Sequence, residues 1–311
     1  MDSPLLYPVR LENNIIYVLD ETQLPFKEDF IEVKDLDKAL WVLSGMKTRS
    51  LGQVLLFFYC CELFNNTFSI DDIAVRFKKE RPTFDFDMLR DIIKLQTERG
   101  TPVKKAVDYF VHGFDVSRRL RAKKLAQILP NPANILTICN INGELICLYE
   151  ELKKLNKSAY FIVCETRPYL QGARLTMWEL MRNNIPCRLI CDNQAAFSMK
   201  QNLVNCVVTG CDRAATKGDI INKIGTYALS RLANYFNIPF YPLTQYPRDI
   251  DIDSIDIEER PKNELFMYLK CNYNDIDGVY PCFDITKKEF ITESIVLSIK
   301  GEKLQMQDEK Q

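Results

Sequence analysis

Two side chains able to exchange protons lie where predicted strands end. Cys139 closes the apolar segment NILTIC, and Asp212 follows the apolar segment NCVVTG. A carboxylate that leaves a dry strand tends to have a raised pKa, which suits proton donation near neutral pH. A helix is predicted soon after Cys139, and a helix N-terminus lowers the pKa of a thiol and favours its nucleophilic or basic thiolate. The pair therefore predicts acid–base chemistry.

Each of these residues also has a plain structural interpretation. Cys139 is one of 11 cysteines, and free cysteines are most often small apolar core residues. Asp212 could pair with Arg213 at the surface, while Asp219 caps the next helix. Spacing alone leaves these alternatives open.

Two further segments could hold an anion. Gln171-Gly172-Ala173 predicts a tight turn whose backbone can approach a ligand, and Asn222 and Lys223 are predicted to begin a helix. Amide groups and an ammonium at a helix start attract negative charge. The alternative for the first segment is a capped loop between a strand and a helix, with Arg174 on the surface.

The elements that must position these residues alternate between strand and helix after Asn131-Pro132. Continuous apolar runs of about six residues are typical of a parallel sheet that is covered on both faces. The predicted strands are NILTIC (134–139), AYFIVCE (159–165), PCRLIC (186–191), NCVVTG (205–210) and PFYPLTQ (239–245). Ligands of such sheets bind beyond the carboxyl ends of the strands, which is where Cys139 and Asp212 lie.

The part before Asn131 has a different pattern. The segment RLENNIIYVLD alternates as a strand does, and apolar residues recur at helical spacing from Leu36 to Phe64 and again to about Leu129. We therefore expect an α/β protein. Residues 1–130 would form a mainly helical domain with a short N-terminal sheet, and residues 131–311 a Rossmann-like catalytic domain with a doubly wound parallel sheet.

Composition excludes several classes of function. The net charge of -1 argues against a nucleic-acid-binding protein, and the apolar runs are too short to cross a membrane. Eleven cysteines without a C-x-x-C pair and a start without a signal-peptide pattern favour the reducing cytoplasm. The single histidine argues against a zinc site, and no G-x-G-x-x-G or Walker-type loop occurs. We expect no metal and no cofactor.

Two long segments, ETRPYLQGARLTMWEL (165–180) and TGCDRAATKGDIINKIGTYAL (209–229), resemble the methylthioribose-1-phosphate isomerase family. That family is related to ribose-1,5-bisphosphate isomerases and to regulatory subunits of a translation-initiation nucleotide-exchange factor. The resemblance covers nearly the whole chain in the same order. Shorter segments that share it are VLDETQLP, IPCRLICDNQAAFSM, IEERP and YPCFDIT.

The resemblance implies a helical N-terminal domain, a Rossmann-like C-terminal domain, a homodimer and a phosphorylated pentose as substrate in methionine salvage. It also implies roles for individual residues. Cys139 and Asp212 match the catalytic pair of the family. The positions that match substrate contacts are Gln171, Asn222 and Lys223. Arg49 with Ser50 matches an arginine motif near the sugar phosphate, and Arg81 matches a second arginine. Two loops depart from the family pattern. Ile138 replaces a common histidine, and Arg49-Ser50-Leu51-Gly52 replaces Arg-Gly-Ala-Pro.

We therefore expect an aldose–ketose isomerase that converts 5-methylthioribose 1-phosphate, or a close ribose 1-phosphate, to the ribulose 1-phosphate. Asp212 would protonate the ring oxygen and then act on the oxygen of C2, while the Cys139 thiolate would move a proton from C2 to C1. A hydride shift is an alternative. The rival class is a non-catalytic regulatory or sugar-phosphate-sensing protein on the same fold, which the altered loops at 49–52 and 138–145 favour and the retained Cys139 and Asp212 do not.

Overall fold

The computed structural model describes residues 2–245, 247–267, 269 and 276–296. The chain opens with a three-stranded antiparallel sheet, β1 (Val9–Glu12), β2 (Ile15–Leu19) and β3 (Phe30–Val33). The alternating segment predicted as one strand is a hairpin, because Asn13 and Asn14 take up left-handed backbone conformations, with φ of 49° and 60°. A short 3-10 turn, Pro4–Leu6, precedes this sheet.

Helices follow the sheet and pack around an aromatic core. The helical pattern from Leu36 to Phe64 divides into two helices, and the loop between them carries Arg49 and Ser50. Phe57, Phe77 and Phe86 lie in the core of this part, with ring centroids 5.2–5.5 Å apart. The helices are α1 (Leu36–Ser44), α2 (Leu51–Phe64), α3 (Ile70–Glu80), α4 (Phe86–Thr97) and α5 (Val103–Ile128).

The C-terminal part is built on a parallel sheet of six strands in the order β12-β10-β7-β4-β5-β6. All five strands predicted from the sequence are present, and the predicted α/β class is correct. The sixth strand, β12, has only two residues and was not predicted. The strands are β4 (Ala133–Thr137), β5 (Ala159–Cys164), β6 (Cys187–Ile190), β7 (Cys206–Thr209), β10 (Phe240–Thr244) and β12 (Ile295–Val296).

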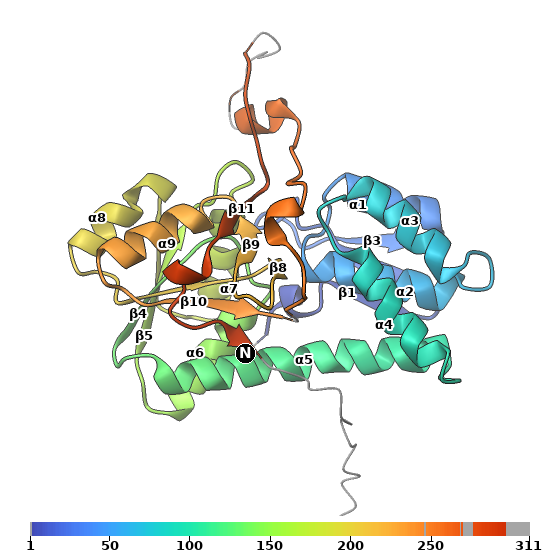
Figure 1. Cartoon of the computed structure of the whole chain (residues 1–311), viewed down its shortest axis with the longest axis horizontal. Helices are drawn as coiled ribbons and strands as arrows, with labels where there is room; N and C mark the ends of the chain where they lie inside the picture. Colours follow the sequence, from blue (N-terminus) through green and yellow to red (C-terminus); the bar gives the residue numbers. More distant parts are fainter. Residues whose placement is uncertain (1, 246, 268, 270–275, 297–311) are drawn as a thin grey trace, which may run out of the picture.

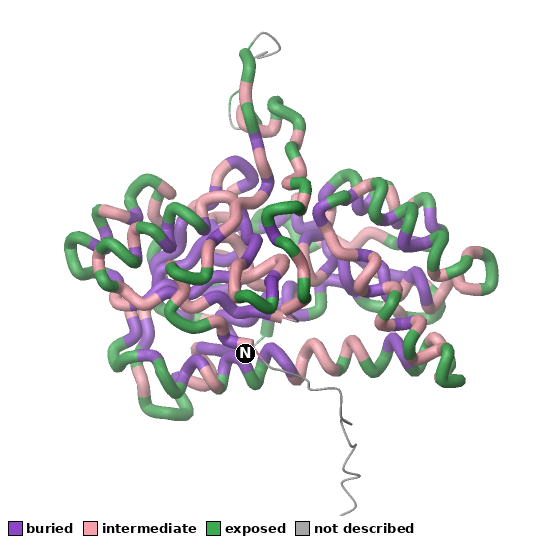
Figure 2. Tube along the Cα trace, viewed as in Figure 1, coloured by how far each residue is buried: buried purple, intermediate pink, exposed green. Residues whose placement is uncertain are grey.

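Helices cover both faces of this sheet, as a doubly wound architecture requires. Apolar residues of α5 and α6 (Glu144–Lys154) pack on one face, and those of α8 (Ala195–Lys200) and α9 (Thr226–Tyr235) pack on the other. Most of the strands are buried between these layers, whereas the edge strand β6 and the outer helical surfaces are more exposed (Figure 2). A π-helical turn (Gly172–Thr176) leads into α7 (Met177–Arg182).

The helix α5 connects the two parts of the chain. It has 26 residues, runs along both parts (Figure 1), and packs against α2 and α4 at one end and α6 at the other. The division predicted at 130/131 falls between the end of α5 and the start of β4. Because α5 contributes to both cores, this division into domains stays a prediction.

A second small sheet, which the sequence did not predict, lies beside the carboxyl ends of the parallel strands. Its strands are β8 (Arg213–Ala214), β9 (Ile220–Lys223) and β11 (Phe283–Thr286). Asn222 and Lys223 were predicted to begin a helix. They instead end strand β9, and the helix α9 begins at Thr226. The prediction was wrong because β9 pairs with β11, a partner some sixty residues later, and long-range pairing leaves no local pattern.

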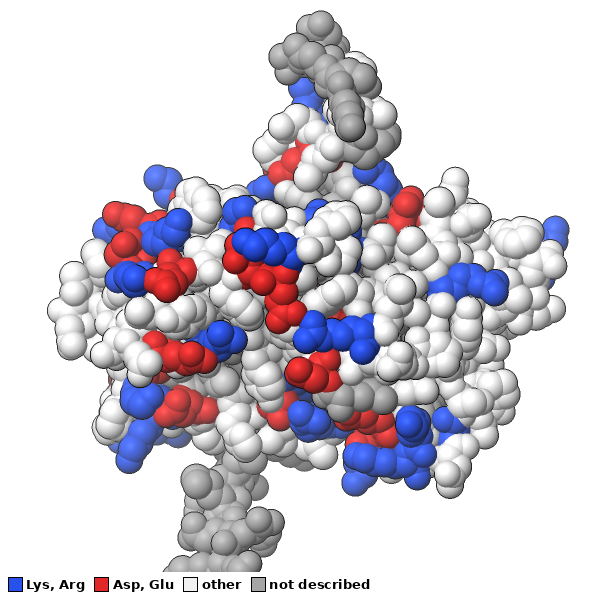
Figure 3. All heavy atoms as spheres, turned by 180° about the vertical axis from the view of Figure 1, so that it is seen from behind, with Lys and Arg blue, Asp and Glu red and all other residues white. Residues whose placement is uncertain are grey.

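The surface carries charges of both signs. On the face shown in Figure 3, basic and acidic side chains lie close together, in keeping with 41 basic and 42 acidic residues in the chain. Within the part of the chain that the structure describes, no helix has the length and apolarity needed to span a membrane.

Candidate active site

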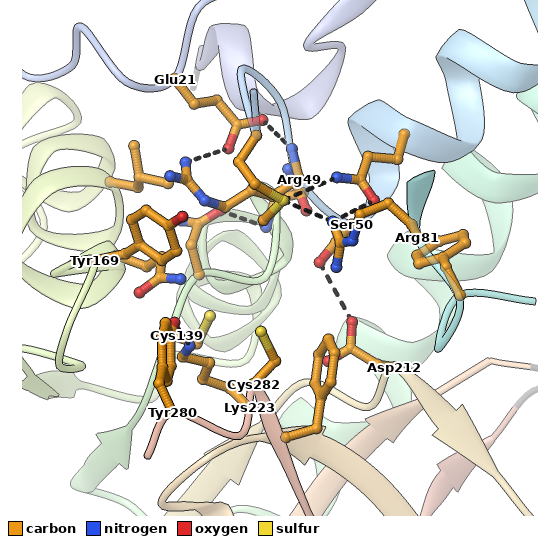
Figure 4. Close-up of a pocket in the computed structure, with 18 residues that line it drawn as sticks. Glu21, Arg49, Ser50, Arg81, Cys139, Tyr169, Asp212, Lys223, Tyr280 and Cys282 are labelled. Atoms are coloured by element: carbon orange, nitrogen blue, oxygen red, sulfur yellow. Dashed lines mark hydrogen bonds and ion pairs between the residues drawn. The ribbon is translucent and has the colours of Figure 1, made fainter. Parts of the chain in front are cut away.

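A cavity of about 590 Å³ lies between the loop that joins α1 to α2, the end of α3, and the carboxyl ends of the parallel strands (Figure 4). Most of the residues predicted to be functional line it together. They are Arg49, Ser50, Arg81, Cys139, Gln171, Asp212 and Lys223. The remaining predicted residue, Asn222, lines an adjoining cavity that shares Cys139 and Asp212 with the first.

Cys139 is held at the end of β4 by its backbone. Its φ is 66°, its N–H donates to Thr166 Oγ1 at 2.8 Å, and its carbonyl accepts from Thr176 Oγ1 at 2.6 Å. Thr166 is fixed in turn, because its N–H donates to Asp192 Oδ1 at 2.8 Å. Asp192 thus supports the turn that supports the cysteine.

The protonation state predicted for Cys139 is wrong for the ligand-free protein. Desolvation raises the pKa of its thiol to about 11, although Lys223 acts to lower it. The helix that was expected to stabilise a thiolate, α6, begins only at Glu144, beyond a left-handed N-cap at Gly143. Because the field of a helix end acts over about one turn, this helix start is too far along the chain to keep the thiol ionised.

Asp212 has the raised pKa that its place after a buried strand predicts. Desolvation raises it to about 6, while Arg81 and Lys223 act to lower it. At that value the carboxyl is mainly ionised at neutral pH, so the expectation that it stays protonated there is wrong for the free protein. The alternative of a surface pair with Arg213 is also wrong, since the Arg213 guanidinium donates to Asp85 instead. Asp219 accepts from Lys287 and Lys288 and does not cap α9.

Two neutral side chains contact the Asp212 carboxylate. Ser50 Oγ donates to Asp212 Oδ1 at 3.4 Å. With its amide nitrogen turned toward Asp212, Asn222 donates to Oδ2 at 3.1 Å and to the Gly210 carbonyl at 3.3 Å, and its oxygen accepts from Thr226 Oγ1. This amide orientation is assigned from the surrounding donors and acceptors.

Three cations enter the cavity from different elements. Arg49 pairs with Glu21 (3.4 Å) and lies over the Tyr169 ring. Lys223, from β9, is 5% exposed, donates to the Tyr280 hydroxyl at 2.7 Å, and has its pKa lowered by desolvation.

The third cation, Arg81, caps the C-terminal end of α3 and is 3% exposed. Its Nε donates to Glu258 Oε2 at 2.9 Å, and its Nη1 donates to Met46 and Gln53. Its guanidinium is therefore engaged by protein groups on two sides, which fixes its position at the cavity wall.

Buried polar atoms without a protein partner mark one end of the cavity. Arg49 Nε and Gln171 Oε1 are both buried and make no hydrogen bond with the described residues. The N-terminus of α2 lies beside them, because its N-cap residue Ser50 lines the same cavity. Buried polar groups are normally paired, so a ligand that offers an anionic oxygen to Arg49 Nε and a hydroxyl donor to Gln171 Oε1 fits this end.

Two glycines allow these close approaches. A Cβ at Gly52 would lie 1.7 Å from Thr48 Oγ1, so glycine lets α2 begin directly against the loop that carries Arg49. A Cβ at Gly172 would lie 1.8 Å from the Cys164 carbonyl, so glycine lets the π-helical turn that follows Gln171 pack on β5.

The adjoining cavity, of about 1210 Å³, extends from the same two reacting residues toward the N-terminal helices. We call it the apolar chamber, because apolar side chains, most of them from α2, α4 and α5, form much of its wall. Its apolar lining consists of Leu51, Val54, Phe58, Phe84, Met88, Leu89, Ile92, Phe110, Phe114, Ile141 and Leu243. Its polar end contains the buried ion pair of Arg121 with Glu144, at 2.7 and 3.0 Å.

Sequence reasoning missed several residues of the cavity. Glu21, Tyr169, Tyr280 and Cys282 line it, yet none was named as functional. A signal was present, since Glu21 lies in VLDETQLP and both Tyr280 and Cys282 lie in YPCFDIT, two of the recognised segments. Their place in the cavity depends on long-range packing, such as the pairing of β11 with β9.

No group of three or more potential metal ligands of the His, Cys, Asp or Glu type occurs within residues 2–245, 247–267, 269 and 276–296. The polar groups of the cavity are instead cations and amides, together with the carboxylates of Glu21 and Asp212. This set suits an anionic, hydroxyl-bearing organic ligand.

The chain is similar to known proteins over nearly its whole length. The profile of the initiation factor 2 subunit family matches residues 9–296. The methylthioribose-1-phosphate isomerase of Acetivibrio thermocellus is 32% identical, over 94% of this chain and 95% of that protein. The enzyme of the same name from Caldicellulosiruptor saccharolyticus is 33% identical, over 91% of this chain and 92% of that protein.

Solved structures show the same likeness. The 5-methylthioribose 1-phosphate isomerase of Pyrococcus horikoshii OT3 superposes with a TM-score of 0.77 at 26% identity, covering 93% of this chain and 90% of that one. The translation initiation factor eIF-2B subunit delta of A. fulgidus superposes with a TM-score of 0.72 at 25% identity, covering 93% of each chain. The fold is therefore shared by enzymes and by initiation-factor subunits.

Proposed function

We propose, from the premise that this chain belongs to the initiation factor 2 subunit family, that it is an isomerase of 5-methylthioribose 1-phosphate. The observation that carries the proposal is that Cys139 and Asp212 line one cavity whose wall also holds Arg49, Arg81 and Lys223. A binding protein needs the cations but has no need of an acid–base pair beside them. Relatives that are 32% and 33% identical and bear this enzyme's name support the assignment.

The phosphate belongs at the end of the cavity where Arg49 has an unpaired buried donor, and a sugar hydroxyl can donate to the unpaired Gln171 Oε1 nearby. Charge-assisted hydrogen bonds from a guanidinium to phosphate are among the strongest that a site can offer. Lys223 and the N-terminus of α2 add positive potential there. We assign Arg49, Ser50, Gln171, Asn222 and Lys223 to substrate binding, with Arg81 fixing the charge beside Asp212.

The methylthio group belongs in the apolar chamber. Val54 lies one helical turn after Ser50 in α2, so it faces the same side as the serine that contacts Asp212. An apolar substituent on C5 gains free energy on leaving water for such a wall. A second phosphate would lose its hydration there, and the two guanidiniums that line the chamber, Arg118 and Arg121, already pair with Asp115 and Glu144. The chamber therefore favours 5-methylthioribose 1-phosphate over ribose 1,5-bisphosphate.

The reaction needs one proton on the pair formed by Cys139 and Asp212. In the free protein that proton lies on the thiol, since the pKa values are about 11 and about 6. Transfer of it to Asp212 gives the reactive form, a thiolate beside a carboxylic acid, without any change in net charge. Because both forms carry the same number of protons, pH profiles report the pair and not either residue alone.

Each step then balances. The thiolate of Cys139 takes the proton from C2, and the electrons of that C–H bond form a C1=C2 double bond. The bond from C1 to the ring oxygen breaks at the same time, and Asp212 protonates that oxygen. The Asp212 carboxylate next takes the hydroxyl proton of C2, a carbonyl forms there, and C1 receives the proton from Cys139. Both residues end in their starting state, as a catalyst must.

Assembly and location complete the proposal. We propose a homodimer in the cytoplasm, on the strength of the family resemblance and of cysteine usage typical of a reducing compartment. Size-exclusion chromatography with light scattering tests the dimer, and a monomer at micromolar concentration would count against it.

The experiment that tests the function is ¹³C NMR of the purified protein with three sugar phosphates, scored for a ketone carbonyl at C2. We expect conversion of 5-methylthioribose 1-phosphate and of 5-deoxyribose 1-phosphate, and little conversion of ribose 1,5-bisphosphate. Saturable binding of all three without any ketose would instead support the regulatory alternative, which the altered sequence at 49–52 favours.

A further inference from the structure

The segment Arg81–Asp85, which joins α3 to α4, is fastened to the C-terminal part of the chain at alternate residues. Arg81 donates to Glu258, and the Thr83 hydroxyl donates to the Asp256 carbonyl at 3.1 Å while accepting from the Glu258 N–H at 2.8 Å. We call residues 81–85 the clasp. It connects the helical part to the part that carries Asp212.

Asp85 is the residue of the clasp that bridges two cations of the C-terminal part. Its Oδ2 accepts from Arg213 Nη2 and from Arg248 Nη1, both at 3.1 Å, and its Oδ1 caps α4 by accepting from the Met88 N–H. Arg213 also donates to the Thr83 carbonyl at 3.0 Å. The side chains of Asp85 and Arg213 are only 15% and 18% exposed, so this pair is largely shielded from solvent.

The attachment acts on the residue next to the reacting carboxylate. Arg213 directly follows Asp212 and begins β8, and the Asp212 N–H donates to the Ile221 carbonyl of β9 at 2.9 Å. Asp85, Arg213, Arg248 and Asp212 line one small cavity of about 370 Å³. Anchoring the Arg213 side chain therefore limits where the Asp212 carboxylate can lie.

We propose that Asp85 is a positioning residue, which closes the clasp through Arg213 and Arg248 and so holds Asp212 and Arg81 in register across the cavity. Only the expected effect of Asp85 on turnover rests on the proposed function. Asp85 lies outside the cavity that holds Arg49 and Lys223; it lines the apolar chamber and the small cavity beside Asp212.

The clasp also sets the charge environment of Asp212. The ionisable groups that act on this carboxyl are Arg81 at the end of α3, Lys223 on β9 and the thiols of Cys139 and Cys211. Of these, Arg81 gives the largest lowering of the Asp212 pKa. Asp85 neutralises Arg213 and Arg248 beside Asp212, so removing its charge leaves two guanidiniums near this carboxyl, and the pKa of Asp212 should fall.

The test uses Asp85→Asn, because asparagine keeps the N-cap of α4 and the shape of the side chain while removing the charge that attracts both arginines. Asp71→Asn is the matched control. Asp71 also bridges two cations, Lys94 and Arg90, in the same helical part, but it lies away from the cavity. Arg248→Gln, which removes a guanidinium that is 40% exposed, loosens the clasp more gently should Asp85→Asn fold poorly.

We expect kcat/KM to fall about tenfold in Asp85→Asn, as for a small displacement of a reacting group, and to recover in part in Asp85→Glu. In the ligand-free protein, ¹³C NMR titration of the Asp212 carboxyl should give a lower pKa in Asp85→Asn, which loses a negative charge near Asp212, than in wild type or Asp71→Asn. Arg248→Gln loses a positive charge in the same place, so it should give a higher pKa. An unchanged Asp212 titration in both clasp variants would overturn the proposal. A wild-type protein that fails to isomerise would overturn the proposed function alone, since the titration still decides the clasp.

Discussion

The active site has two ends, the cavity that holds Arg49 and Lys223 and the apolar chamber, which adjoin at Cys139 and Asp212 and differ in the side chains that line them. The first end, which we call the anion end, presents Arg49, Gln171 and Lys223 and leaves two buried polar atoms unpaired. The other end, the apolar chamber, presents leucine, valine and phenylalanine side chains from α2, α4 and α5. Recognition is thus divided between two surfaces, and the chemistry takes place at their boundary.

The largest effect is expected from substitutions of Cys139 and Asp212, the two residues at which both ends of the site meet. Cys139→Ser and Asp212→Asn should each lower kcat by about a hundredfold or more, as expected for a lost acid–base group, without unfolding the protein. Cys187→Ser and Asp219→Asn are the matched controls, because neither residue lines the cavity. The effect is measured as the turnover of 5-methylthioribose 1-phosphate by each variant. A folded Cys139→Ser protein with full activity would show that the thiol is structural.

The anion end is tested by Arg49→Ala. We expect KM for the sugar phosphate to rise about ten- to a hundredfold, because the change removes a charge-assisted contact of roughly 1.5–3 kcal/mol. Arg49→Lys, which retains the charge but not the fork of donors, should lie between this variant and wild type. If calorimetry gives the same affinity for the sugar phosphate in Arg49→Ala as in wild type, the phosphate must bind elsewhere.

The activity that depends on Cys139 and Asp212 should also change with pH. Desolvation holds the pKa of Asp212 at about 6 and that of Cys139 at about 11, so the pair carries one proton between these values. Below pH 6 Asp212 is protonated as well and the pair carries two protons, so kcat/KM should fall about tenfold from pH 8 to pH 5. A profile of kcat/KM that stays flat between pH 5 and pH 8 would contradict these protonation states.

The smallest expected effect is in the apolar chamber. Val54→Thr places a hydroxyl group of nearly the same shape in the wall, so the preference for 5-methylthioribose 1-phosphate over ribose 1-phosphate should fall about three- to tenfold. Val75→Thr in α3 is the control, because Val75 is exposed. Competition between the two substrates measures the ratio, and an unchanged ratio would move the methylthio group out of the chamber.

The comparison of the two ends also explains what the sequence could predict. Each parallel strand is a local apolar run, and each such run ends in polar residues. The sheet, the boundary residues and the raised pKa of Asp212 follow from that local pattern. Gln171 and Lys223 of the anion end were named because they lie in long segments with a family resemblance, and Arg49 because it matches an arginine of the family near the sugar phosphate.

The rest depends on contacts between distant segments. Strand β9 was predicted as a helix start because its partner β11 follows much later in the chain. The thiolate prediction for Cys139 failed because desolvation depends on packing around the thiol, which spacing does not report. The apolar chamber forms only when α2, α4 and α5 face the parallel sheet, and Asp85 gains its partners only when Arg213 and Arg248 come to meet it.

The most direct measurement is a crystal structure of Asp212→Asn with 5-methylthioribose 1-phosphate bound. We predict that the phosphate oxygens lie within hydrogen-bonding distance of Arg49 Nε and the Gln171 amide, and that the methylthio group lies against Val54 and Phe58. C2 should face the Cys139 sulfur. A phosphate bound in the apolar chamber, or a sugar whose C2 lies away from Cys139, would contradict the division of the cavity proposed here.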